Sequence, residues 1–528
     1  MLHGSRRAVS AAALGGASAV LGFGYASEQP SREEDLPRRW DGAAIEAYWD
    51  ARPFATVGRA CAIARTVAPV LGGLAADYAT APRDEPKPAR DARLRARAIQ
   101  GRDALVALGP AFIKLGQALS IRPDVVPAAA LDELRSLCDA VPAIPTSTAL
   151  ATVAAEVGAM SFGGLDASTP PVAAASLGQV YKVELEGRTV ALKVQRPDVI
   201  AAVALDLALL RKWARFVERA KLYLAPKQRP YDEALVEAFS RGAWSELDYE
   251  QEAANQEDMA AKLALATSRT LRRNVHIPAV RLRSRKVLAT DWVDGDQLCR
   301  ASQAEIARLV PLGVELFMWQ MLDVGTYHCD PHPGNLLVDA RGRLALIDFG
   351  LCTEIDVGER EALTKAVVHL IQGAVPALID DAVALDFLPA DVDKEALYPV
   401  LSRVFEDARL AARASPDVAA VKKRRKEFAA VSADLNDIFF NYPFRVPDFF
   451  ALITRALIIL EGIAISGDPD FDIFKAAYPH GLRRAEQIFG RQGLAEISAA
   501  AAAAYLAPRR RATVAVDVGE DVVVAASS

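Results

Sequence analysis

Hydrophobic and polar residues follow two different periods along this chain of 528 residues. Near residue 180, the stretches VYKVEL and TVALKVQ alternate or run apolar, and only EGR separates them, which predicts a β-hairpin. VHIPAVRL and KVLATDWVDG predict a second pair of strands, and LLVDARGRLALI predicts two short strands around a turn. The pattern therefore predicts small β-rich regions within a largely helical chain.

Helical spacing covers most of the remaining sequence, at about 40–78, 99–120, 131–160 and 201–265, and over most of the chain beyond 300. PRDEPKPARDARLRAR, at 82–97, combines prolines with charge and predicts a linker that leads into a basic helix. From Ser498 onward the sequence has low complexity, which predicts a disordered end.

Two apolar segments bear on targeting and membranes. Residues 449–467 contain Arg455 and Glu461, and such charges cost about 2.5 to 3.5 kcal/mol each at the centre of a membrane helix. We therefore expect a buried helix there and no transmembrane helix in the chain. Residues 1–27 contain two arginines and no acid, which favours an organelle-targeting or signal-like leader over a disordered tail.

Composition narrows the function further. The chain is 52% apolar and 24% charged, with a net charge of −5, so no general basic field indicates a nucleic-acid partner. Its five cysteines are dispersed without a C-x-x-C pair. This usage favours a reduced compartment and argues against a disulfide framework or a zinc site.

The strongest chemical signal lies in HCDPHPGN and IDFG. Phosphoryl transfer needs an acid near the attacking hydroxyl, and an asparagine and a second acid on the metal. Asp330 and Asn335 are five residues apart, and Asp348 of the D-F-G follows thirteen residues later. Each of these residues alone is more often structural, with His328 and His332 as loop packing, but their order and spacing together indicate a kinase-type site.

A lysine that contacts phosphates requires an acidic partner. Lys193, in TVALKVQ, is the candidate, and its partner is expected on the helix predicted from WSELDYEQEAANQ. Asp248 and Glu252 are four residues apart and are predicted to share one helix face. The alternative is a solvated acidic face, which we prefer for Glu250.

Two further segments depart from ordinary kinases. Where a glycine-rich loop is expected, the chain has AAASLG, with Ala173, Ala174, Ala175 and Ser176. Alanine resists the positive φ values that glycine adopts freely, so this loop is predicted to be stiffer. Upstream, KLGQ places Lys114 and Gln117 on one helix face, and Gly116 permits close backbone approach.

These motifs together resemble the UbiB-type atypical kinases, the aarF-domain family. KLGQ matches its K-x-G-Q signature, AAASLGQVY its alanine-rich loop, VALKVQRP its lysine strand and ELDYEQEAAN its acidic helix; HCDPHPGN and DFG complete the set. The resemblance covers roughly residues 40–485, and WDGAAIEAYWDARPFATVGRA is similar to the branch of cyanobacteria and plastids. Cys329 and Asp291 depart from the residues common in the family.

The resemblance implies an α+β, protein kinase-like two-lobe fold, with a small β-rich N-lobe, a helical C-lobe and an N-terminal helical K-x-G-Q extension. The expected division is a targeting segment, a family-specific helical region with linker, the K-x-G-Q extension, the N-lobe, the C-lobe and a low-complexity tail, at 1–27, 28–98, 99–165, 166–295, 296–485 and 486–528.

The resemblance also assigns roles and cofactors, ATP and Mg. Lys193, Glu252 and Asp330 are expected to be catalytic, and Asn335 and Asp348 to hold metal. The nucleotide is expected to contact the alanine loop, Lys193 and Asp291. A regulatory lid is expected from Lys114, Gly116, Gln117, Glu246 and Asp248.

The predicted function is an ATP- and Mg-dependent atypical kinase or ATPase that supports prenylquinone or isoprenoid-lipid metabolism. No A-P-E motif follows the D-F-G, so a small or lipid acceptor, or water, is favoured over a peptide. Such an acceptor is compatible with peripheral membrane association. The alternative is a nucleotide-binding regulator or scaffold without turnover. The expected location is an organelle, with the plastid preferred to the mitochondrion.

Overall fold

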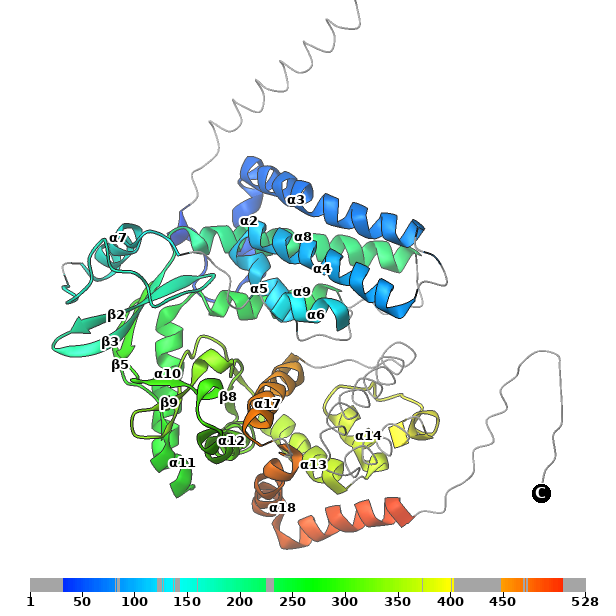
Figure 1. Cartoon of the computed structure of the whole chain (residues 1–528). Helices are drawn as coiled ribbons and strands as arrows, with labels where there is room; N and C mark the ends of the chain where they lie inside the picture. The colour runs from blue at the N-terminus through cyan, green and yellow to red at the C-terminus, as the bar shows by residue number, and fades with distance from the viewer. Residues whose placement is uncertain are drawn as a thin grey trace, which may run out of the picture.

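The computed structural model describes residues 32–80, 86–120, 128–135, 143–158, 160–224, 232–372, 374–399, 401–402, 448–468 and 473–506, and the single residues 82, 126, 137 and 471. A group of long helices forms one side of the molecule, a β-sheet lies at one end, and a mainly helical body lies on the other side (Figure 1).

The helical group combines the N-terminal region with two helices from beyond residue 198. It consists of α2 (Gly42–Asp50), α3 (Pro53–Thr80), α4 (Lys87–Leu108), α5 (Pro110–Leu119), α6 (Ala128–Arg135), α8 (Val199–Leu224) and α9 (Asp232–Ser245). The Asp41 side chain accepts from the Ala44 amide and caps α2. Gly109, with φ of 100°, separates α4 from α5. Apolar residues of α2, α8 and α9 share one core cluster.

The N-lobe sheet has five strands in the order β1-β2-β3-β6-β5. They are β1 (Ala173–Ala174), β2 (Gly178–Leu185), β3 (Arg188–Gln195), β5 (Val280–Arg283) and β6 (Val287–Asp291). Glu186 and Gly187 form the β2–β3 turn, with φ values of 49° and 74°. Apolar residues of α7 (Thr146–Val157) share a core cluster with this sheet, and α10 (Tyr249–Leu265) contacts β5 and β6.

The C-lobe is built around α12 (Gln303–Met318). Ser302 and Glu305 form a capping box at the N-terminal end of this helix. Its other helices are α11 (Arg269–Asn274), a π-helical turn (Trp319–Val324), α13 (Val357–Gln372), α14 (Val375–Ala384), α17 (Asp448–Gly467) and α18 (Ile473–Leu506). Short 3-10 turns cover Glu33–Asp35, Leu298–Arg300 and Pro333–Asn335.

Two smaller sheets are present among the described residues. One has the order β4-β10-β9-β7, from Val275–His276, Leu344–Leu346, Leu336–Asp339 and Gly295–Gln297. The other pairs β8 (Thr326–His328) with β11 (Cys352–Glu354), antiparallel. These sheets fix the segments that precede and follow HCDPHPGN and DFG.

Several predictions from the pattern are confirmed. The β2–β3 hairpin, the β5–β6 pair and the β9–β10 pair are antiparallel as expected. The apolar run at 449–467 forms α17, whose Ile453, Ala456 and Leu460 are buried in the C-lobe core. The kinase-like two-lobe fold with its helical extension is thus present.

Other predictions are corrected or lie outside the described residues. The expected disorder from Ser498 is wrong as far as Leu506, because α18 continues through the alanine run, and alanine is the best helix former. One helix of the described residues, α3, is long and apolar enough to cross a membrane, since an 18-residue stretch of it has a mean hydropathy of 1.3. Residues 1–27 and 507–528 lie outside the described part.

Candidate active site

Lys193 lies near the end of β3, where its side chain meets two acids. Its Nζ donates to Glu252 Oε1 at 2.9 Å and Oε2 at 2.7 Å, and to Asp348 Oδ1 at 3.4 Å. The lysine comes from the sheet, Glu252 from α10 and Asp348 from the segment after β10. Three elements far apart in sequence thus place one cation between two carboxyl groups.

The two carboxyl groups differ in proton affinity. Glu252 is 3% exposed, and burial raises its pKa to about 7 against the opposing effect of Lys193. Burial also acts to raise the pKa of Asp348, but Lys193 and Lys114 outweigh it and lower that pKa to about 2. Burial opposes the charge of Lys193, whereas Asp348 and Glu252 hold its pKa well above the ordinary value.

Asp348 has a backbone conformation that is strained for a residue with a Cβ, with φ of 62°. His328 supports it: Nε2 lies 2.5 Å from the Asp348 carbonyl oxygen, and Nδ1 accepts from the Asp330 amide at 3.2 Å. The imidazole also packs edge-on against Phe349, with centroids 5.2 Å apart. Burial lowers the pKa of His328, which favours the neutral ring that can donate at Nε2 and accept at Nδ1.

The loop with Asp330 and Asn335 is closed by its own hydrogen bonds. Asn335 Nδ2 donates to the Asp330 carbonyl at 2.9 Å, and the Gly334 amide donates to His332 Nδ1 at 3.1 Å. Because His328 links this loop to Asp348, the three residues predicted from spacing lie in one connected site. Their catalytic and metal-binding roles stay predictions.

These residues fit a nucleotide with magnesium. Asp348 is ionised at neutral pH and its side chain is 46% exposed, so it can offer the hard oxygen ligand that magnesium prefers. In the described part of the chain, no three His, Cys, Asp or Glu side chains converge into a metal cluster. Magnesium in nucleotide sites is commonly held by one or two side chains and by phosphate oxygens. Asp348 and Asn335 would hold it here, and the ion would neutralise phosphate charge.

The alanine loop differs from its predicted form. Ala173 and Ala174 form β1 and pair with Val180 and Gln179, so Ala174 is a strand residue and not the middle of a loop. The turn between β1 and β2 is shorter than the predicted loop. The Ala175 amide donates to the Gly178 carbonyl at 2.8 Å, and Arg196 Nε donates to the Ala175 carbonyl at 3.0 Å. Ser176 is buried. None of these residues has a positive φ.

The predicted lid residues are only partly brought together. Lys114 on α5 forms an ion pair with Glu246, which follows α9. Burial opposes the charge of Lys114, but Glu246, Asp330 and Asp348 raise its pKa, which shows that α5 lies close to the site. Gln117 Nε2 instead donates to the Leu137 carbonyl at 3.2 Å. A Cβ at Gly116 would meet Leu137 and Leu105, as close approach requires.

Two other predicted positions have local partners. Asp248 does not share a helix face with Glu252, because it precedes α10 and caps it by accepting from the Glu250 amide at 3.0 Å. Asp291 ends β6 and accepts two hydrogen bonds of 2.6 Å from Arg281. That guanidinium holds the pKa of Asp291 below its usual value.

Three residues that were not predicted from the sequence as part of the site also contact it. His328 was regarded as loop packing. Asn255 Nδ2 donates to the Phe349 carbonyl at 3.0 Å, and the Tyr249 ring lies 4.9 Å from Lys193 Nζ. Tyr249 and Asn255 each lie three residues from Glu252 along α10, so helical spacing could have placed them on the same side.

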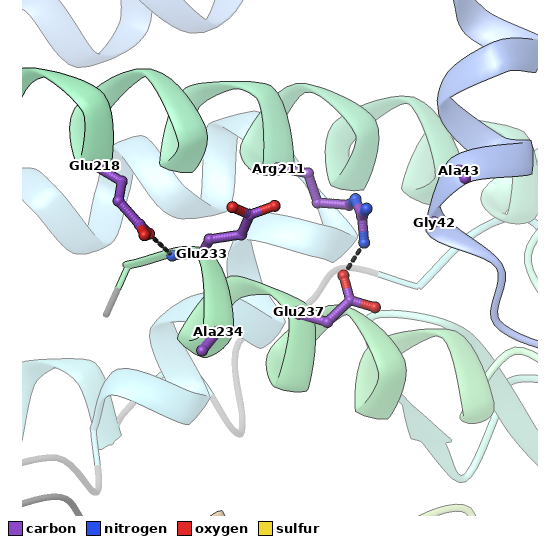
Figure 2. A pocket seen from close by; sticks show the side chains of 7 residues that line it. All are labelled: Gly42, Ala43, Arg211, Glu218, Glu233, Ala234 and Glu237. Carbon is purple, nitrogen blue, oxygen red and sulfur yellow. Dashed lines mark hydrogen bonds and ion pairs between the residues drawn. The ribbon is translucent and has the colours of Figure 1, made fainter. Parts of the chain in front are cut away.

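A separate cavity of about 560 Å³ lies between α2, α8 and α9 (Figure 2). Its lining residues are Gly42, Ala43, Arg211, Glu218, Glu233, Ala234 and Glu237. Arg211 pairs with Glu237, and Glu218 accepts from the Glu233 amide at 2.9 Å (Figure 2). Its charges are therefore used to hold these helices together, and no predicted site residue lines it.

A strand lysine held by a helix glutamate, beside an Asp–Asn loop and a D-F-G acid on a two-lobe scaffold, defines a kinase-like protein. Residues 136–380 match the ABC1 atypical kinase-like domain. The chain belongs to the ABC1 atypical kinase-like family.

Known proteins similar to this chain include Protein ACTIVITY OF BC1 COMPLEX KINASE 3, chloroplastic, of Arabidopsis thaliana, which is 36% identical over 74% of this chain. This chain spans 54% of that protein's length. An uncharacterised protein of Synechocystis is 34% identical over 86% of this chain and 77% of its own length. Among solved structures, the Rv3197–erythromycin complex from Mycobacterium tuberculosis has a TM-score of 0.44 and 23% identity, over 67% of this chain and 87% of that chain.

Proposed function

We propose that this protein is an ATP- and Mg-dependent atypical kinase or ATPase whose acceptor is a small or lipid molecule, or water. The arrangement of Lys193 with Glu252 and Asp348 carries the proposal. Lys193 would contact the nucleotide phosphates and Glu252 would orient it. Asp348 and Asn335 would hold magnesium, and Asp330 would accept the proton of the attacking hydroxyl.

The choice of acceptor rests on the sequence and on α5. No A-P-E motif follows DFG, and α5 brings Lys114 close to Asp330 and Asp348. We infer a role in prenylquinone or other isoprenoid-lipid metabolism, with peripheral association at a membrane. The chloroplastic name of the Arabidopsis relative supports a plastid, which we prefer to the mitochondrion.

The first test is magnesium-dependent nucleotide binding. Thermal shifts with ATP or ADP, with magnesium or with EDTA, are measured for wild type, Asp348→Asn and Asp330→Asn. Asp348→Asn should lose the magnesium-dependent part of the shift, because an amide is a much weaker ligand than a carboxylate. Asp330→Asn should keep binding and lose turnover by about 100-fold or more, as expected for loss of a general base.

Asp380→Asn is the matched control, since Asp380 is an exposed acid on α14 that pairs with Lys394. An unchanged magnesium-dependent shift in Asp348→Asn would contradict the metal assignment. Binding without turnover in wild type, with prenylquinone and lipid profiles altered in cells that lack the protein, would favour the regulator or scaffold instead.

A further inference from the structure

α3 lacks the polar outward face of an ordinary surface helix. Exposed residues recur every three or four positions along it and form one continuous outward face; they include Val57, Cys61, Ala64, Ala68, Leu71 and Ala75. Arg65 is the only charged residue among the exposed positions of α3. A helix that borders water normally presents charged and polar residues there.

The other charged residues of α3 point inward and form ion pairs. Arg59 donates to Asp206 of α8 at 2.7 and 2.9 Å, and Arg97 of α4 donates to Asp77 at 2.7 and 3.0 Å. Because Arg59 and Asp77 lie near the two ends of the helix, the contacts hold its whole length against the body. Figure 1 shows α3 along the outer edge of the helical group.

Exposed aromatic residues of α8 extend this apolar surface. Trp213 lies seven residues after Asp206 and therefore on the side of α8 that α3 contacts, yet it is 61% exposed. Phe216 packs against it with centroids 5.6 Å apart, and Tyr223 is 88% exposed. Between Trp213 and Tyr223, the other exposed residues whose side chains are described are Arg219 and Lys221, both basic.

We propose that the outward faces of α3 and of the C-terminal half of α8 dock on an anionic lipid bilayer, with α3 lying in the plane of the interface. Apolar residues would enter the acyl boundary, tryptophan and tyrosine would lie at the headgroups, and the three exposed basic residues would meet anionic lipid. The charge argument is specific: the chain carries a net charge of −5, but these exposed positions include no acid.

The ion pairs of α3 favour a helix that lies in the plane of the bilayer over a helix that crosses it. A crossing α3 would leave α8 and α4, which would break both ion pairs, and it would carry the charge of Arg65 into hydrocarbon. In the plane, both pairs stay intact while the outward face is buried. This proposal goes beyond the nucleotide chemistry and holds or fails without it.

The experiment measures flotation of the full chain with phosphatidylcholine vesicles, with and without phosphatidylglycerol. Wild type should bind, more tightly with phosphatidylglycerol, and alkaline carbonate should release it. Leu71→Glu combined with Leu74→Glu should lower the partition coefficient by about tenfold or more, since two apolar side chains are lost from the interface and two negative charges are added. The matched control is Leu265→Glu with Val357→Glu, because both residues are exposed apolar residues elsewhere, at 84% and 62%. It should bind within twofold of wild type.

Cys61 gives a second readout in the unaltered protein, because it is an exposed cysteine on the outward face of α3. Vesicles should slow its reaction with a membrane-impermeant maleimide, while Cys299, away from α3 and only partly exposed, should react at an unchanged rate in the same mass spectra.

No vesicle binding by wild type, or equal loss in the control variant, would overturn the proposal. Resistance to carbonate would overturn the in-plane arrangement. A dimer that the Leu71 and Leu74 variant alone dissociates, with vesicle binding unchanged, would assign the face to a second copy of the chain. Circular dichroism and melting temperature establish that both variants fold.

Discussion

At the scale of single residues, the two carboxyl groups that contact Lys193 differ in their exposure to water and therefore in their affinity for a proton. Glu252 is nearly inaccessible and Asp348 is about half exposed, yet both contact Lys193. A proton that enters this group of three therefore goes to Glu252, and Asp348 stays charged. The exposed carboxylate is the one that can reach a metal and a nucleotide, which is the arrangement that the proposed function needs.

The raised pKa of Glu252 predicts a pH-dependent stability. The ordinary value is 4.5 and burial raises it to about 7, so the folded state holds a proton that the unfolded state releases across this interval. The contribution of Glu252 to the free energy of unfolding is complete below about pH 4.5 and is lost as pH rises through about 7. Relative to Glu252→Gln, wild type should therefore lose stability between these pH values.

Urea unfolding of both proteins at a series of pH values measures this difference. Groups common to the two proteins cancel, so the comparison isolates Glu252. Glu250→Gln, whose carboxylate is 45% exposed and pairs with Arg38, controls for removal of an acid from the same helix. A difference between wild type and Glu252→Gln that is flat across the range would show that the pKa of Glu252 is not raised in the folded protein.

At the scale of elements, the alanine-rich segment packs against a tyrosine at Gly178. The Tyr249 ring lies beside Lys193, and its hydroxyl has no hydrogen-bond partner among the described residues. A Cβ at Gly178 would lie 2.5 Å from that hydroxyl and 2.6 Å from the Val194 carbonyl oxygen. The single glycine of AAASLG is thus required by close packing, since φ is not positive there.

We predict that Gly178→Ala destabilises the protein by about 1 to 3 kcal/mol, the usual cost of overpacking, and weakens ATP binding because the turn above the site must shift. Gly101→Ala is the matched control: it lies within α4 with no atom near its Cβ position, and should stabilise by about 0.4 to 1 kcal/mol. Urea unfolding and ATP titration test both variants. Equal stability of the two variants would contradict the close contact with Tyr249.

The elements that could be predicted are those with a local signal. The β2–β3 hairpin has two alternating strands and a turn with a glycine, and α17 has an apolar run interrupted by charge. The spacing of Asp330, Asn335 and Asp348 predicted that these residues lie together, and hydrogen bonds through His328 and Asn335 link them in the structure. The β8–β11 pair has three residues in each strand, too few for a period, and depends on partners 24 or more residues away.

Other errors arose where a tertiary or capping contact overrides the local pattern. Asp248 has the correct spacing for a helix face, but its short side chain caps α10 instead. Ala174 was assigned to a loop because β1 has only two residues. His328 and Asn255 act through hydrogen bonds to backbone carbonyls, which residue types alone do not reveal.

At the scale of the whole molecule, the helical group reaches the kinase-like lobes beside the candidate site through α5. Lys114 of α5 pairs with Glu246, which lies between α9 and the start of α10. The same ammonium contributes to the low pKa of Asp348 and is influenced by Asp330. The extension therefore contributes to the electrostatics of the candidate site.

From this arrangement we predict that the folded protein does not phosphorylate peptides. A peptide would have to lie along the region that α5 approaches, and no A-P-E motif supplies a docking platform for it. The measurement incubates wild type, Lys114→Met and Asp330→Asn with Mg·ATP and a peptide library and reads phosphopeptides by mass spectrometry. Nucleotide-dependent thermal shifts show that each protein is folded and binds. Wild type should give no stoichiometric product, and Lys114→Met should weaken the contact of α5 with the site without creating a peptide platform, so it too should leave the library unmodified. Stoichiometric peptide phosphorylation by wild type that Asp330→Asn abolishes would instead make this chain a conventional protein kinase, with α5 displaced during the reaction.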